Sequence, residues 1–313
     1  FSKLDKNYSL IFQNQNNDQI NFSQANWIGS TSNAIPPLSN PTLISKNEEA
    51  YLTNNDIIIG INLNDNEIAF PIKIIKWHGV INQKIKNQTY SIIYCPASNS
   101  ITAFESELGN LSLSSLFLEN SCLIKNDQGI LINSETGIYG NKNKLKRIPI
   151  MQATWQFWKN YYPNSRVLSK NTGIVIDYDE LMPKWAQLFN PDSLVQEIAK
   201  YEPNSSFNTY VNYHYIEEKK EILLYKIYDY RIVYQTIDTK RFLTIILDNG
   251  IGARTFYAPP DEITQISYTS KNGWLARDSE NIYWFISDNG LINQDDSSFY
   301  SEIANYISYK KIP

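Results

Sequence analysis

The chain has 313 residues, of which 42% are hydrophobic, 19% are charged and 13% are aromatic, and its formal net charge is −4. This length supports a substantial core and excludes a small fold that depends on metals or disulfides. The mildly acidic balance argues against a nucleic-acid partner, and the absence of an apolar run of about 18 residues predicts no membrane span.

The N-terminal residues 1–33 are polar and rich in Asn and Gln, and we interpret them as an extended arm. Such an arm can add a strand to the sheet edge of a protein partner or of a second copy, so we expect it to serve assembly. Further on, Ser45 and Glu48 form a capping-box pattern that predicts a short helix ending at Leu52.

Residues 57–106 carry strand signals separated by turn-forming residues. The β-branched run Ile57–Leu63 and the run Glu67–Ile72 flank an Asn-Asp-Asn sequence, which predicts a hairpin. Tyr90–Tyr94 and Ile101–Glu105 predict a second hairpin. Strand pairing therefore dominates the expected structure of this stretch.

Trp77, His78 and Cys95 are the residues of this stretch that could support chemistry. We expect Trp77-His78 to end one strand and Cys95 to end another, because a turn at Lys86–Gln88 sends the chain back. This arrangement places the imidazole and the thiol at neighbouring strand ends, with Ser98 beside them.

Five motifs along residues 27–179 resemble the family called domain of unknown function 3179. They are AIPPLSNPTLIS (34–45), WHGVIN (77–82), YCPASNSITAF (94–104), LSSLFLENSCLIKND (113–127) and TWQFWKNYYPNSRVLSKNTG (154–173). The resemblance implies that Asn82 is a turn-forming or site-orienting amide. It also implies that Ser98 replaces the second cysteine of a CxxC pair, and it implies no activity because the family has none assigned.

The remaining chain alternates strand signals with a few helices. A helix is predicted over 154–162, with Thr154 as N-cap and Trp155 and Trp158 on its packed face. Further helices are predicted at 190–201 and 298–307, on either side of strand signals that run from Tyr210 to Phe285. RFLTIILDNGIGARTFYA (241–258) can be aligned with QTYSIIYCPASNSITAFE (88–105), with Asp248 against Cys95, which suggests a degenerate repeat.

These patterns predict a mainly β protein with two related β-rich halves and a few peripheral helices. The expected divisions are an arm at 1–33, a family-like domain at 34–180, a helical connector at 181–205 and a second β-rich half at 206–313.

His78 and Cys95 allow two kinds of site, a thiol–imidazole pair or a copper or zinc site. A metal site needs more ligands, and only Glu105, Asp127 and the distant His214 are available to add to the pair. The candidate site residues are His78, Cys95, Ser98, Trp77 and Asn82. A disulfide between Cys95 and Cys122, the two cysteines of the chain, stays open at this level.

Export is the expected location, because the chain starts at Phe1 as if a targeting segment had been removed. Candidate glycosylation sites of the form N-x-S/T lie at Asn7, Asn21, Asn87, Asn110 and Asn204. The favoured hypothesis is an exported or cell-surface protein with a non-catalytic interaction or structural role. The alternative is a copper- or zinc-binding or thiol-redox protein that uses His78 and Cys95.

Overall fold

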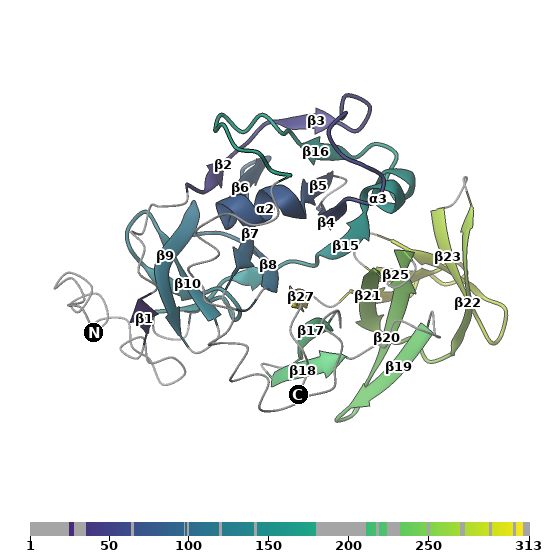
Figure 1. The fold of residues 1–313 in the computed structure, drawn as a ribbon. Coiled ribbons are helices and arrows are strands. Elements are labelled where there is room, and N and C mark those ends of the chain that lie inside the picture. Colours follow the sequence, from purple (N-terminus) through teal and green to yellow (C-terminus); the bar gives the residue numbers. More distant parts are fainter. Residues whose placement is uncertain are drawn as a thin grey trace, which may run out of the picture.

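The fold is mainly β, which confirms the predicted class: the described part of the chain forms five sheets and two short helices (Figure 1). The computed structural model describes residues 25–27, 36–63, 66–96, 98, 100–118, 121–140, 143–179, 211–216, 219–223, 232–248, 251–269, 273–287, 290–302 and 305–308. The predicted helix at 190–201, the connector at 181–205 and most of the arm lie outside these ranges.

Three sheets are built mainly from the first half of the chain. Sheet A contains, in spatial order, β1 (Asn26–Trp27), β9 (Leu111–Leu118), β10 (Ser121–Asn126), β11 (Leu131–Asn133), β12 (Ile138–Tyr139) and β13 (Asn143–Lys144). Sheet B contains β18 (Lys219–Leu223), β17 (Val211–Ile216), β27 (Asn305–Ser308), β8 (Ser100–Glu105), β7 (Gln88–Cys95), β6 (Val80–Ile85) and β2 (Leu38–Ser39), and β14 (Lys146–Arg147) also pairs with β8. Sheet C contains β15 (Met151–Thr154), β4 (Ile57–Asn62), β5 (Glu67–Pro71), β16 (Arg166–Leu168) and β3 (Leu43–Ser45).

Two sheets come from the second half alone. Sheet D contains β19 (Ile232–Ile237), β20 (Lys240–Leu247) and β21 (Gly252–Tyr257). Sheet E contains β22 (Ile263–Thr269), β23 (Gly273–Asp278), β24 (Tyr283–Ile286), β25 (Gly290–Asn293) and β26 (Phe299–Ser301). Because β17, β18 and β27 complete sheet B, the second half also contributes strands to a sheet of the first half.

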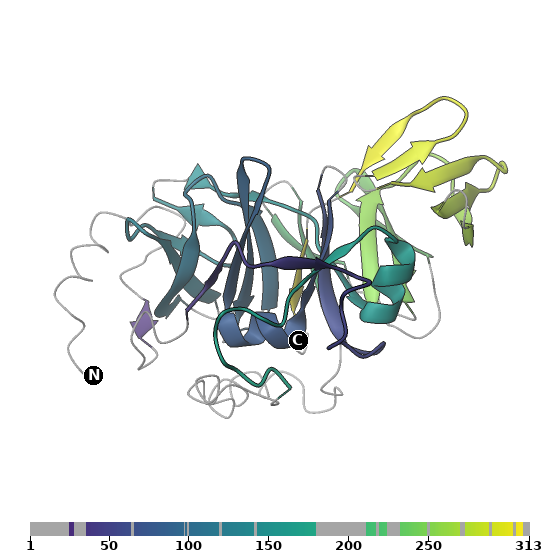
Figure 2. The ribbon, with the colours of Figure 1, turned by 90° about the horizontal axis from the view of Figure 1, so that it is seen from above.

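The two halves share a hydrophobic core. The helix α3 (Trp155–Tyr161) begins at Thr154, whose hydroxyl accepts the backbone N–H of Phe157, as predicted for an N-cap. Its buried Trp155 and Trp158 pack in one cluster with residues of sheets D and E, including Leu243. In both views the teal helix lies beside the green strands of the second half (Figures 1 and 2).

Three-strand meanders of matching geometry support the predicted repeat. β6, β7 and β8 have 6, 8 and 6 residues, and β19, β20 and β21 have the same lengths. Each first turn contains a non-glycine residue with positive φ, Lys86 at 55° and Asp238 at 53°. The register pairs Cys95 with Ser100 and Leu247 with Gly252, so Leu247 and not Asp248 is the counterpart of Cys95. The sequence alignment was therefore wrong by one residue.

The repeat extends into the second sheet of each half. In the turn after β10, the Asn126 side chain accepts the N–H groups of residues 128 and 130, and in the turn after β23 Asp278 accepts those of residues 280 and 282. The first residue of β9, Leu111, donates its N–H to Asn82 of β6. Ile263 of β22 likewise donates to Tyr234 of β19. Sheets A and E are therefore counterparts.

Two predicted helices are wrong. In place of the helix predicted at 298–307, Phe299–Ser301 form β26 and Asn305–Ser308 form β27, because each segment finds a strand to pair with: β26 lies beside β25, and β27 lies between β8 and β17. At Ser45 the capping contact forms, with its N–H donated to Glu48 at 2.9 Å, but the chain then turns. Glu49 accepts the N–H of Leu52 there, and such local side-chain bonds compete with a helix.

The predicted strand end at Trp77-His78 is also wrong, because these residues lie on a helix, α2 (Ile72–His78). Pro71 ends β5 and caps the helix, since proline has no N–H to continue the ladder. Gly79, with φ of 69°, ends the helix and donates its N–H to Ile75. A short apolar run of isoleucines fits a strand and a buried helix equally well, which explains the error.

Gly60 provides a test of the core packing. A Cβ at this position would overlap the ring of Trp158, which lies directly over the β4 backbone. We predict that Gly60→Ala lowers the free energy of unfolding by about 1–3 kcal/mol, measured by chemical denaturation. Ser267→Ala, at an exposed strand position, is the control and should stay within about 0.5 kcal/mol. Equal stability of the two variants would contradict this packing.

Candidate functional site

The family-like motifs meet at the C-terminal end of α2, where His78 is 1% exposed. Its Nδ1 lies 2.9 Å from the carbonyl oxygen of Pro36, and its Nε2 lies 2.7 Å from the hydroxyl of Tyr178. The Tyr178 hydroxyl is in turn 2.6 Å from that of Thr172. A continuous hydrogen-bonded chain therefore links residues 36, 78, 178 and 172.

The partners of His78 determine its tautomer. A carbonyl oxygen only accepts, so Nδ1 carries the proton and donates to Pro36. Nε2 then accepts from the hydroxyl of Tyr178. Burial lowers the pKa of His78 below its ordinary value of 6.5, so the ring is neutral at pH 7. Both ring nitrogens are thus occupied by protein groups.

An ion cluster forms around Lys73, which lies on the same helix five positions before His78. Lys73 Nζ is 3.1 Å from Asp56 and 2.7 Å from Asp179, and Lys170 is 3.7 Å from Asp179. Burial opposes the charge of Lys73, but the hydrogen bonds to Asp179 and Asp56 raise its pKa. The same bond lowers the pKa of the Asp179 carboxyl. The cluster and His78 together fix the segment 172–179 against α2.

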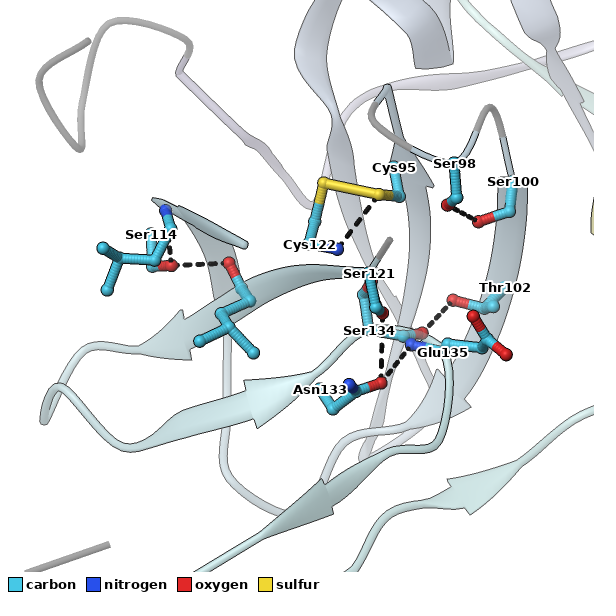
Figure 3. The surroundings of a disulfide bond; sticks show 12 residues. Cys95, Ser98, Ser100, Thr102, Ser114, Ser121, Cys122, Asn133, Ser134 and Glu135 are labelled. Carbon is cyan, nitrogen blue, oxygen red and sulfur yellow. Dashed lines mark hydrogen bonds between the residues drawn. A yellow bond between two sulfur atoms is a disulfide. The ribbon is translucent and has the colours of Figure 1, made fainter. Parts of the chain in front are cut away.

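Cys95 forms a disulfide with Cys122, with Cα atoms 5.5 Å apart, and the described chain contains no free cysteine. Cys95 is 1% and Cys122 is 4% exposed. The bond joins the end of β7 in sheet B to β10 in sheet A (Figure 3). The structure therefore resolves the alternative that the sequence left open, and Cys95 has no thiol to share with His78.

His78 and Cys95 nevertheless lie next to two residues whose backbones are hydrogen-bonded to each other. The Tyr94 N–H donates to the carbonyl of Gly79 at 2.7 Å. His78 directly precedes Gly79 in the chain, and Cys95 directly follows Tyr94. Their side chains have separate partners, Tyr178 for His78 and Cys122 for Cys95. The described contacts do not join the two side chains into one site.

Ser98 lies in the β7–β8 turn, beside the disulfide (Figure 3). It is buried, and its hydroxyl is 2.5 Å from that of Ser100, the residue paired with Cys95. Nearby, Thr102 donates to the carbonyl of Ser134 at 2.9 Å. The surroundings of the disulfide are thus polar and hydrogen-bonded.

Asn82 is buried and acts as a bridge between sheets. Its Nδ2 donates to the carbonyl of Leu111 at 2.9 Å, and its Oδ1 accepts the N–H of the same residue at 2.9 Å. Ser91 donates to the same Oδ1 at 2.7 Å. The Asn82 amide therefore bonds to Leu111 as a paired backbone residue would, and it ties the start of β9 in sheet A to β6 in sheet B. Trp77, on α2, is half-buried, and its Nε1 has no hydrogen-bond partner in the described structure.

The other proposed metal ligands are dispersed. Glu105 pairs with Lys146 at 2.9 Å, and Asp127 is exposed in the turn after β10. His214 lies on β17, for which only the backbone is described. Across the described ranges, no three His, Cys, Asp or Glu side chains gather as a metal-binding group. Neither helix described is long and apolar enough to cross a membrane.

Two of the five sequons fall in described residues. Asn87 is exposed in the β6–β7 turn, and Asn110 is exposed just before β9. Both positions are accessible to a modifying enzyme, so glycosylation at these two asparagines stays a prediction. Asn7, Asn21 and Asn204 lie outside the described ranges.

Tyr178 and Thr172 are site residues that the sequence analysis missed. Tyr178 is about 100 positions from His78 along the chain, and its hydroxyl is recognisable as a partner only once the segment after β16 folds back on α2. The one feature of the sequence that could have indicated them is their place near the end of the family-like residues 27–179.

The fold and this site define a mainly β protein in which residues of the family-like motifs, His78, Asn82 and Cys95, make buried hydrogen bonds or a disulfide to distant parts of the chain. A family model described as protein of unknown function (DUF3179) matches residues 32–237, and the chain belongs to this family. No curated protein and no solved structure gives a significant match.

The neutral, buried His78 predicts a pH dependence of stability. Its pKa is lower in the folded than in the unfolded state, so the unfolded state binds more protons once pH falls below about 6.5. The folded protein should therefore lose stability on acidification through this range, by at most about 1.4 kcal/mol per pH unit from this residue.

The measurement is the free energy of unfolding between pH 5 and 8. His78→Gln should flatten the dependence, whereas Tyr178→Phe keeps the imidazole and should retain it. Any contribution of His214 is common to all three proteins. An unchanged pH profile in His78→Gln would contradict the assignment.

Proposed function

We propose that this is an exported or cell-surface protein with a non-catalytic interaction or structural role. The observation that carries the proposal is the buried Cys95–Cys122 disulfide, which occupies the position where the family-like motif has its first cysteine. Disulfides form and persist in oxidising compartments outside the cytosol. The bond therefore supports export and gives Cys95 a structural use.

The other motif residues support the same role. His78 has a protein partner on each ring nitrogen, and Asn82 holds two sheets together. A side chain whose polar atoms are all engaged in this way positions backbone segments, and must break those bonds before it can act on a ligand.

The alternative function, copper or zinc binding or thiol redox through His78 and Cys95, is favoured by no observation of comparable weight. A buried disulfide offers neither a nucleophilic thiolate nor a thiolate ligand until it is reduced. Metal analysis of the protein purified from its source, with His78→Ala beside it, tests this. Stoichiometric copper or zinc that is lost in the variant would overturn the proposed function.

An arm that serves assembly remains part of the proposal. Within the arm, Asn26 and Trp27 pair with Phe117 and Leu116 at the edge of the chain's own sheet A. Part of the arm can therefore pair as a strand with the edge of a sheet. Deletion of residues 1–26 should lower the mass of any assembly measured by light scattering, and an unchanged mass would remove the arm from the proposal.

The disulfide should make a large contribution to stability. It closes a loop across 27 positions, for which the chain-entropy model gives about 3.5 kcal/mol. We predict that Cys95→Ser/Cys122→Ser lowers the free energy of unfolding by roughly 2–5 kcal/mol.

The export proposal is tested on protein taken from its source and denatured with an alkylating agent. We expect no alkylation before reduction and two modified cysteines after it, measured by intact mass. Two alkylated cysteines in the unreduced sample, prepared without exposure to reductant, would show that the native protein carries thiols and would contradict export into an oxidising compartment.

A further inference from the structure

Comparison of the two repeated units shows that the outer edge of β9 has a partner strand in the first half, whereas the outer edge of its counterpart β22 has none in the described chain. β9 and β22 are counterparts, because each pairs with the next strand of its sheet and begins with a buried residue, Leu111 or Ile263, opposite the turn residue Asn126 or Asp278. On its far side, β9 is covered by β1. In the described part of the chain, no strand pairs with the outer edge of β22.

The register identifies the positions on the outer edge of β22 where a partner strand would pair, as β1 pairs with β9. β1 pairs with Leu116 and Phe117, which lie opposite Leu123 and Cys122. The corresponding positions on β22 are Ser267 and Tyr268, which lie opposite Leu275 and Trp274. The Tyr268 side chain is 47% exposed. An edge that is paired in one copy of the repeat is therefore solvent-accessible in the other.

The composition of β22 favours pairing over protection. Exposed edges are usually protected by charged residues or proline, and Ile263–Thr269 contains neither. Its one irregularity is a bulge between Ile263 and Gln265, which leaves Gln265–Thr269 regular. The edge strand β18, by contrast, has the sequence KKEIL. Sheet E also lies at the end of the molecule away from β1, where another molecule can approach (Figures 1 and 2).

The open edge at β19, the counterpart of β6, is less accessible. β19 is uncharged as well, but its side chains are mostly half-buried, whereas most of those on β22 are exposed. A strand added to β22 would therefore meet fewer obstacles. β19 provides a matched comparison, because it differs from β22 in exposure and not in charge.

We propose that β22 pairs antiparallel with β22 of a second copy to form a symmetric dimer. A two-fold axis at Ser267 places Ser267 opposite its own counterpart and Tyr268 opposite Ile266 of the second copy. The uncharged strand brings no like charges together, so it is complementary to itself. The backbone bonds of the edge are then satisfied, as β1 satisfies those of β9.

The dimer extends an apolar row on the outer face of sheet E. Leu275, Phe285, Ile292 and Phe299 lie in register next to Ser267. The alternate residues, such as Trp284 and Leu291, pack into the shared core, so this row is on the opposite face. Phe299 is 53% exposed. This face could support a different dimer, which the experiment must distinguish.

The mass of the full chain in solution tests the proposal, by light scattering after size-exclusion chromatography. The expected result is at least twice the chain mass, because the arm adds any contacts of its own to the β22 contact. Ser267→Lys should raise the dissociation constant of the β22 contact at least about tenfold, because two lysines meet at the axis. Ser267→Glu should weaken it similarly. A mixture of the Ser267→Lys and Ser267→Glu proteins should restore the dimer, since opposite charges then face each other.

The controls locate the contact. Thr236→Lys on β19 and Phe299→Asp on the outer face should leave the dimer intact, and circular dichroism should show that each variant is folded. A monomeric wild-type protein, or a dimer that is broken by either control and not by Ser267→Lys, would overturn the proposal. These results are independent of the disulfide and metal tests, so this inference and the proposed function can fail separately.

Discussion

The structure depends on the packing of Trp158 between the two halves. Its ring lies over Gly60 of β4, and its Nε1 donates to the Ser165 hydroxyl at 2.6 Å. The cluster around it joins α3 and sheet C to sheets D and E. Close approach recurs at Gly252 of β21, where a Cβ would overlap the carbonyl oxygen of Gln152. Burial on this scale removes apolar surface of both halves from water, so this cluster forms only where the two halves meet.

Buried polar residues fix the segments that this core does not hold. His78, Asn82 and Cys95 each join parts of the chain that belong to different elements: the segment after β16, sheet A, and β10. A buried polar group is costly unless it is hydrogen-bonded, and these residues are. The same saturation explains why residues that suggest chemistry in the sequence lie in the fold with their polar atoms already bonded to protein groups.

The repeat gives the two halves the same plan and different surfaces. In the first half, β2 lies beside β6 and β1 lies beside β9, so both outer edges of the repeated unit are paired. The counterparts β19 and β22 have no such partner in the described chain. Of the two repeated units, the one in the second half therefore has outer edges without a partner strand in the described chain, and the first half carries the family motifs.

By itself, the sequence determined the mainly β class, both hairpins of residues 57–105 and the helix beginning at Trp155, because local signals such as turn residues and the Thr154 cap are sufficient for these. It also suggested the repeat, which the matching strand lengths of the two meanders support. It did not determine α2, the strands β26 and β27, or the register of the repeat to within one residue. Isoleucine-rich and tyrosine-rich segments are compatible with either helix or strand, and available neighbours such as the β8 edge decided between them. Only the tertiary structure paired Cys95 with Cys122 and His78 with Tyr178. A disulfide or a hydrogen bond requires its two atoms to meet, and residues 27 and 100 positions apart in the chain meet only after the sheets have packed.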